Sequence, residues 1–152
     1  MEDCCSTNLK ETRVERNGIC PSCKNKAKNV KLITLKSLLK PSALETLNAE
    51  ETHYFCSTKD CDVVYFDSIN KKYLISEIKV SVHQKEDSKT TLICYCFDWT
   101  KDAIEKHVKQ ELFPKPIEQI RENIHKNRCG CEVNNPQGSC CFGNVTKYIK
   151  SI

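Results

Sequence analysis

The chain lacks the features of fibrous, exported and membrane-spanning proteins. Only 4 of its 152 residues are glycine and 5 are proline, which excludes collagen-like and glycine- or proline-rich low-complexity structure. No uncharged apolar run is long enough for a transmembrane helix, and the polar start at Met1–Cys5 has no apolar core of the kind found in secretory signals. These absences predict a cytoplasmic protein with no membrane insertion.

Charge of one sign is not in large excess either. The formal net charge is +4, from 24 basic and 20 acidic residues, and the mean hydropathy is -0.53. This surplus is too small to indicate the basic face of a typical nucleic-acid-binding domain. Nucleic acid is therefore not expected as a partner.

Cysteine, in contrast, is abundant. The 12 cysteines make up about 8% of the chain, near the level that indicates a cysteine-based scaffold. They occur in close pairs at Cys4/Cys5, Cys20/Cys23, Cys56/Cys61, Cys94/Cys96, Cys129/Cys131 and Cys140/Cys141. Because cytoplasmic thiols stay reduced, this grouping indicates metal sites more than disulfides.

The sequence pattern predicts an α+β protein with two small domains. After a polar tail at 1–15, a β-rich, zinc-ribbon-like domain covers 16–83 and a small helical domain covers 91–152, with a charged linker at 84–90 between them. Domains of this size often need metals or other cross-links in addition to a hydrophobic core.

Within the first domain, aromatic and β-branched runs predict strands at 30–33, 54–55, 63–66, 73–75 and 78–80. Leucines at helical spacing follow Ile33, and Pro41 is suited to the start of a second short helix.

Helical patterns dominate the second domain. Thr100 is expected to cap a helix that carries Ala103, Ile104 and Val108 on one face. Pro116 opens the next helix, and a last short helix includes Val145.

The first candidate site combines two cysteine knuckles. Cys20 and Cys23 are separated by two residues, and Cys56 and Cys61 by four, so one tight turn can direct each pair at a single ion. Structural zinc is commonly held by four cysteines in a tetrahedron, with no position left for water. The spacing predicts a structural zinc site, and His53 is expected to be a surface residue and not a ligand.

The second candidate site begins with Cys94 and Cys96, whose spacing is too tight for an ordinary zinc knuckle but suits an iron–sulfur cluster. A [2Fe–2S] cluster needs four thiolates, two for each iron. This pair can supply one iron, and one cysteine from each of the two later pairs can supply the other. Phe97, Trp99 and Phe142 are placed to shield such a cluster from water. A second zinc site is the alternative.

The order of these motifs resembles a known family. The run Cys94-Tyr95-Cys96-Phe97, followed by residues 129–141, is similar to the [2Fe–2S] half of CopZ-type copper chaperones, which is itself similar to bacterioferritin-associated ferredoxin. The runs Cys20-Pro21-Ser22-Cys23, Tyr54-Phe55-Cys56 and Cys61–Phe66 resemble the zinc domain of the same proteins.

The resemblance implies a specific set of ligands. It implies zinc on Cys20, Cys23, Cys56 and Cys61, and a [2Fe–2S] cluster on Cys94, Cys96 and one cysteine of each later pair. We favour Cys131 and Cys141, with Cys129 and Cys140 as the alternative cluster ligands.

The resemblance also implies a function. The protein is expected to be a redox carrier more than a turnover enzyme, taking electrons from a redox partner protein and reducing Cu(II) to Cu(I) for a separate copper chaperone or copper-transporting ATPase. Full-length members of the family carry a further domain with an M-x-C-x-x-C copper loop. This sequence stops at Ile152 and its single methionine is Met1, so tight Cu(I) binding by this chain is not expected.

Two other interpretations remain open at this point. The Cys4–Cys5 pair could capture Cu(I), although a functionless tail is the preferred interpretation of that region. The protein could also be a zinc-ribbon module that binds protein or nucleic acid and has no redox role.

Overall fold

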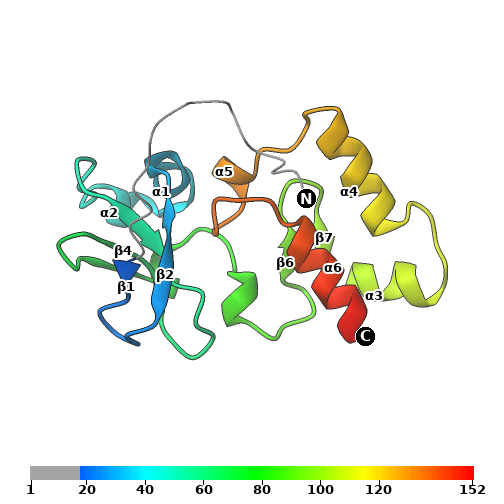
Figure 1. Ribbon diagram of the computed structural model, residues 1–152, viewed down its shortest axis with the longest axis horizontal. Helices are drawn as coiled ribbons and strands as arrows, with labels where there is room; N and C mark the ends of the chain where they lie inside the picture. Colours follow the sequence, from blue (N-terminus) through cyan, green and yellow to red (C-terminus); the bar gives the residue numbers. More distant parts are fainter. Residues whose placement is uncertain (1–17) are drawn as a thin grey trace.

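The computed structural model describes residues 18–152, and it has a strand-rich side and a helix-rich side (Figure 1). A five-stranded antiparallel sheet with the order β1-β2-β3-β4-β5 forms one side. The other side holds a two-stranded sheet and three helices, and the short helix α5 lies between the two sides. The predicted α+β fold class is confirmed. The predicted tail at 1–15 and the Cys4–Cys5 pair lie outside the described residues.

The large sheet consists of short strands joined by turns and helices. Its strands are β1 (Gly18–Ile19), β2 (Lys26–Val30), β3 (His53–Phe55), β4 (Val63–Asp67) and β5 (Lys72–Leu74). Helices α1 (Leu32–Leu38) and α2 (Pro41–Leu44) connect β2 to β3. Leu35 and Leu39 are fully buried and pack with Val64, Tyr65 and Tyr73 in one hydrophobic cluster.

Two strand predictions in this region were wrong in part. The strand expected at 30–33 ends at Val30, which pairs with His53, and α1 begins at Leu32. The apolar residues that follow are buried at helical spacing, so they cover the sheet as a helix and do not extend it. Residues 78–80 form no strand, and Ile78 makes only an isolated bridge with Leu39.

The helical side is built around a small hairpin. Its elements are β6 (Leu92–Cys94), β7 (Trp99–Thr100), α3 (Lys101–Lys109), α4 (Pro116–His125), α5 (Cys131–Asn134) and α6 (Phe142–Ser151). The predicted helix cap is confirmed, since the Thr100 hydroxyl accepts a hydrogen bond from Ala103 N at 3.1 Å. Ile93, Trp99, Ile104 and Val145 meet in the core of this side.

The two sides touch through α1 and the segment that contains α5. The Thr34 hydroxyl donates to Glu132 O at 2.6 Å, and the buried Tyr65 hydroxyl donates to Pro136 O at 2.5 Å. Gly138 has a φ of +70° and passes so close to Thr34 that a Cβ atom would lie 3.0 Å from its hydroxyl oxygen. A side chain there would be strained twice, by the backbone conformation and by the contact.

The segment between the sides is also ordered. Residues 84–90 were expected to be a linker, and at their start they overlap one short 3₁₀ helix, η2 (His83–Lys85). Lys85 is buried although its neighbours after Glu86 are exposed. The expected charged linker therefore begins with a residue that packs into the protein.

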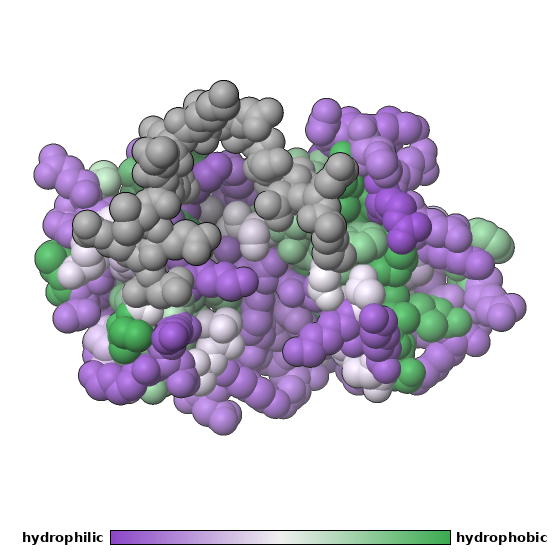
Figure 2. Space-filling view, in the orientation of Figure 1, coloured by the Kyte–Doolittle hydropathy of each residue, from purple (hydrophilic) through white to green (hydrophobic). Residues whose placement is uncertain are grey.

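The surface in Figure 2 is mostly hydrophilic, with hydrophobic residues gathered along the helical side. The large apolar side chains that are exposed include Ile69, Phe113 and Ile152. None of the helices in residues 18–152 has the length and apolar character needed to cross a bilayer.

Candidate metal centres

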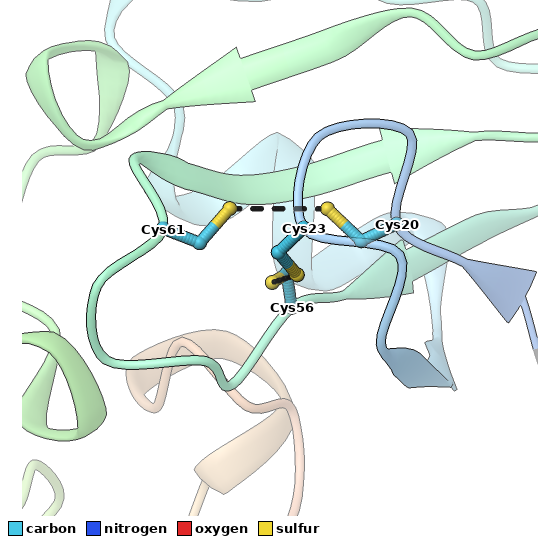
Figure 3. A group of neighbouring side chains, drawn as sticks. All are labelled: Cys20, Cys23, Cys56 and Cys61. Atoms are coloured by element: carbon cyan, nitrogen blue, oxygen red, sulfur yellow. Dashed lines mark hydrogen bonds between the residues drawn. The ribbon is translucent and has the colours of Figure 1, made fainter.

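The sheet topology brings the two cysteine knuckles together. The first knuckle lies between β1 and β2, and the second lies between β3 and β4. Because successive strands run in opposite directions, the turns of both hairpins lie at the same end of the sheet. Figure 3 shows the four side chains converging from these two loops.

The four sulfur atoms are arranged as a single ion requires. All of them lie within 4.8 Å of one another, with Cys20 Sγ 3.9 Å from Cys61 Sγ and Cys23 Sγ 3.7 Å from Cys56 Sγ. A zinc ion with Zn–S bonds of about 2.3 Å separates tetrahedral sulfurs by about 3.8 Å. Within residues 18–152 these four form the one close group of His, Cys, Asp or Glu ligands.

Backbone hydrogen bonds and packing fix the knuckles. Cys20 N donates to Asn25 O at 3.0 Å, and Cys56 N donates to Val64 O at 2.9 Å, so each pair is tied to its own hairpin. Cys20 and Cys56 are 0% and 1% exposed, and they pack with the stacked rings of Tyr54 and Phe66. This apolar support buries Cys20, Cys56 and Cys61 and leaves Cys23 partly exposed.

The thiols differ in their readiness to lose a proton. Burial raises the pKa of Cys56 to about 12, although the nearby charge of Lys85 opposes the change. Burial also raises the pKa of Cys23, but hydrogen bonds with the Thr58 side chain and the Asn25 backbone outweigh it and lower that pKa to about 6. Cys23 therefore loses its proton more readily than Cys56.

His53 is not the surface residue that was expected. It lies in β3, is 2% exposed, and its Nε2 has no hydrogen-bond partner among the described residues. Burial lowers its pKa, against the opposing charges of Asp67 and Glu51. The sequence could not show this, because His53 follows a polar run and only its pairing with Val30 and Asp67 in the sheet buries it.

The other predicted cysteines come from three separate segments. Cys94 ends β6 and Cys96 follows it in the hairpin turn, whereas Cys131 begins α5 and Cys141 is the N-cap residue of α6. Cys94, Cys131 and Cys141 are at most 2% exposed. Two of the four sulfurs therefore lie at helix N-termini, where the helix dipole favours negative charge.

These four thiols interact with one another in pairs. Cys96 Sγ lies 3.6 Å from Cys131 Sγ, and the Cys141 thiol interacts with those of Cys131 and Cys94. Cys96 Sγ also accepts hydrogen bonds from Gly130 N at 3.2 Å and Asn134 Nδ2 at 3.6 Å. The contact with Cys131, together with burial, raises the pKa of Cys96.

The surroundings of this second group are apolar. Trp99 is 6% exposed and is held by a hydrogen bond from its ring N–H to Gln119 Oε1 at 2.7 Å. Phe97 and Phe142 pack against the same cluster, as their positions in the sequence predicted. Cys129 and Cys140 are partly exposed, and Cys140 Sγ accepts from Phe142 N at 3.4 Å.

Sequence reasoning missed one residue of the first site. Lys85 directs its ammonium group into the second knuckle and donates to Thr58 O at 2.7 Å, Cys61 O at 2.8 Å and Cys56 Sγ at 3.9 Å. It stands in a charged run that resembles a solvated linker, and no spacing in that run distinguishes it from its neighbours.

A comparison with protein families agrees with the first site. Residues 17–79 match the family zf_CopZ, described as a zinc binding domain. The match contains all four cysteines of the close group. The family and the geometry together support a four-cysteine zinc-binding site in this part of the chain.

Two comparisons extend over both sides of the molecule. The chain is 30% identical over 132 residues to the copper chaperone CopZ of Archaeoglobus fulgidus, in a match that covers 84% of this chain and 60% of that protein. Its fold is similar to the crystal structure of the N-terminal domain of the same protein, with a TM-score of 0.70 at 24% identity, over 86% of this chain and 96% of that domain. The predicted resemblance to the N-terminal region of CopZ-type proteins is confirmed.

Proposed function

We propose that this CopZ-like zinc-binding protein is an electron carrier of copper handling, with one structural metal and one redox-active metal centre. Zinc is assigned to Cys20, Cys23, Cys56 and Cys61, and a [2Fe–2S] cluster is assigned to Cys94, Cys96, Cys131 and Cys141. A redox partner protein supplies the electron, and Cu(II) is the substrate that receives it. The Cu(I) formed passes to a separate copper chaperone or copper-transporting ATPase of the reducing cytoplasm.

The assignment of a structural role to zinc rests on the donor set. Four thiols from two hairpins fill a tetrahedron, so no position remains for a substrate or a catalytic water. The site joins β1–β2 to β3–β4, and a metal there holds together a sheet whose strands have five residues or fewer. We therefore assign the metal to folding and not to chemistry.

The observation that carries the electron-transfer assignment is the approach of Cys94, Cys96, Cys131 and Cys141 to one another beside an apolar cluster, with three of the four buried. A [2Fe–2S] cluster supplies a one-electron redox couple, and it spans a larger ligand frame than a single ion does. The chain would hold it with four thiolates and stabilise their charge with Gly130 N–H and two helix N-termini.

Burial supports the choice of Cys131 and Cys141 as the second pair of cluster ligands. Cys131 and Cys141 lie inward, in contact with the first pair, whereas Cys129 and Cys140 are partly exposed. We retain Cys131 and Cys141 as the ligands, within a helical domain at 91–152 that is joined through 84–90 to a zinc domain at 16–83.

Metal content and colour test the proposal most directly. Protein purified without oxygen should contain about one zinc and two irons per chain, absorb in the visible region and be bleached reversibly by a reductant. A colourless protein with two zinc ions would refute the redox assignment and favour the zinc-ribbon interaction module.

A second experiment tests the substrate. Reduced protein mixed with Cu(II) and a Cu(I)-specific chelator, without oxygen, should form about one Cu(I) for each reduced cluster as the visible absorption of the oxidised form returns. Free thiols also reduce Cu(II), so the zinc-loaded Cys94→Ser variant is the control. Equal Cu(I) yields from both proteins would contradict copper reduction at the second site.

A further inference from the structure

Lys85 is a buried cation that has no acidic partner among the residues that the structure describes. Its side chain belongs to a residue that is 8% exposed, and no carboxylate of residues 18–152 lies within ion-pair distance of it. The nearest acidic neighbours in sequence are engaged elsewhere, because Asp87 pairs with Lys59 at 2.8 Å and Glu86 accepts from the Thr91 hydroxyl at 3.3 Å. A buried ammonium group is costly unless another negative charge balances it.

The missing negative charge lies at the first cysteine site. The Lys85 ammonium has three hydrogens, and it makes three contacts, all with the second knuckle: two carbonyl oxygens and Cys56 Sγ. Four thiolates around one Zn²⁺ carry a net charge of −2.

The segment that supplies Lys85 is also tied to the second cysteine site. Tyr95, which stands between Cys94 and Cys96, donates its hydroxyl hydrogen to Ser81 O at 2.5 Å and accepts from His83 N at 2.9 Å. Residues 81–85 are thus fastened to the zinc knuckle at one end and to the first cluster pair at the other.

We propose that Lys85 is a positioning residue that balances the charge of the zinc centre and, through residues 81–85, makes the placement of Tyr95 and its neighbouring cysteines depend on zinc. This inference rests on the proposed four-cysteine zinc site and does not require a cluster in the second site. The proposed role of Lys85 predicts that zinc affinity and the protection of the backbone amides of residues 81–96 from hydrogen exchange decrease together.

The test compares four full-length proteins in a zinc competition titration: the wild type, Lys85→Met, Lys85→Arg and Lys24→Met. Lys24 is the matched control, because its ammonium donates to Pro21 O in the first knuckle but is exposed to solvent. Lys85→Met should weaken zinc binding about 10- to 100-fold, as the loss of outer-shell partners of metal sites does. Lys85→Arg should restore most of the affinity because it keeps the charge, and Lys24→Met should stay within about twofold of wild type.

Amide hydrogen exchange provides the second readout. In zinc-loaded wild type, residues 81–96 should exchange slowly, and Lys85→Met should raise exchange there while β3 and β4 stay protected. If Lys85→Met does not fold, Lys85→Gln replaces it, since the amide keeps hydrogen-bond donors but not the charge.

Three outcomes overturn the inference: unchanged zinc affinity in the neutral variants, an equal loss in Lys24→Met, or a failure of arginine to restore binding. Failure of the proposed function is seen separately, as a wild type that binds no zinc or a Cys20→Ser variant that binds it normally.

Discussion

The two cysteine sites are built in different ways, and the difference explains how far each can be predicted. The first uses two hairpin turns of one sheet, so each cysteine pair is local and the sheet order aligns both turns. The second draws on the β6–β7 hairpin and the starts of α5 and α6, which only tertiary packing brings together. A local motif fixes its own geometry, whereas a site assembled from distant segments depends on the whole fold.

The largest expected effect is the loss of the first site. Cys20→Ser or Cys61→Ser should abolish stoichiometric zinc binding and unfold the sheet, because the free energy of metal binding is part of the folding free energy in such small metal-bound units. Zinc content and the circular dichroism melting curve measure this. Full zinc occupancy with a wild-type melting temperature would show that the site does not hold the sheet together.

The second prediction concerns the thiols that the proposed cluster uses. Cys94→Ser and Cys96→Ser should remove or strongly alter the visible spectrum, because no other cysteine lies in that turn. Cys131→Ser and Cys141→Ser should do the same, and the partly exposed Cys129 serves as the control, with Cys129→Ser leaving most of the absorption. A spectrum that survives both changes in the first pair would remove the cluster from this site.

The third prediction concerns pH. Zinc replaces thiol protons, so its affinity should fall as pH falls. The pKa values of Cys20 and Cys56 are raised by burial, the latter to about 12, so both release a proton when zinc binds at pH 7 and affinity should drop at least about 100-fold per pH unit.

Cys23 has a pKa of about 6, so it releases a further proton on zinc binding only below that pH. There the zinc affinity should fall by an additional factor of about ten per pH unit. Competition titrations between pH 5 and pH 8 measure the slope. A slope that is constant across pH 6 would show that Cys23 is not the most acidic thiol.

The smallest expected effect lies at the contact between the two sides. Tyr65→Phe removes the hydroxyl that donates to Pro136 O and leaves a carbonyl unpaired in a buried place. Unfolding free energy should fall by about 1–3 kcal/mol with no change in zinc content. Denaturant titration of the zinc-loaded protein measures this, with Tyr54→Phe as the control for loss of a tyrosine hydroxyl. Equal stability of wild type and Tyr65→Phe would mean that this bond does not help to join the two sides.

Much of the fold could be predicted because it follows from local chemistry. Thr100 and Pro116 are residue types preferred at helix starts, and the β-branched and aromatic residues of β4 form a strand by propensity. The run at 30–33 was misjudged because Val30 ends a strand while Leu32 already belongs to the covering helix. Short apolar runs do not distinguish these states without knowledge of their neighbours.

The missed features all depend on contacts between distant residues. His53 is buried by strands on both sides, and Lys85 reaches cysteine loops that lie more than twenty residues earlier in the chain. Polar residue types in polar runs predict exposure, so nothing in the sequence indicates the burial of either one. The burial of Cys131 and Cys141 relative to Cys129 and Cys140 likewise follows from the packing of α5 and α6.

The contact of α1 with α5 limits how the protein can be recombined. Thr34 and Lys31 of the sheet side bond to the backbone and the carboxylate of Glu132, and Gly138 leaves no room for a side chain beside Thr34. A chimera that takes residues 91–152 from a relative would therefore contain the relative's α5 surface but not the α1 surface that packs against it. Residues 31–34 should therefore be replaced together with residues 91–152, although the expected linker at 84–90 separates them in the sequence.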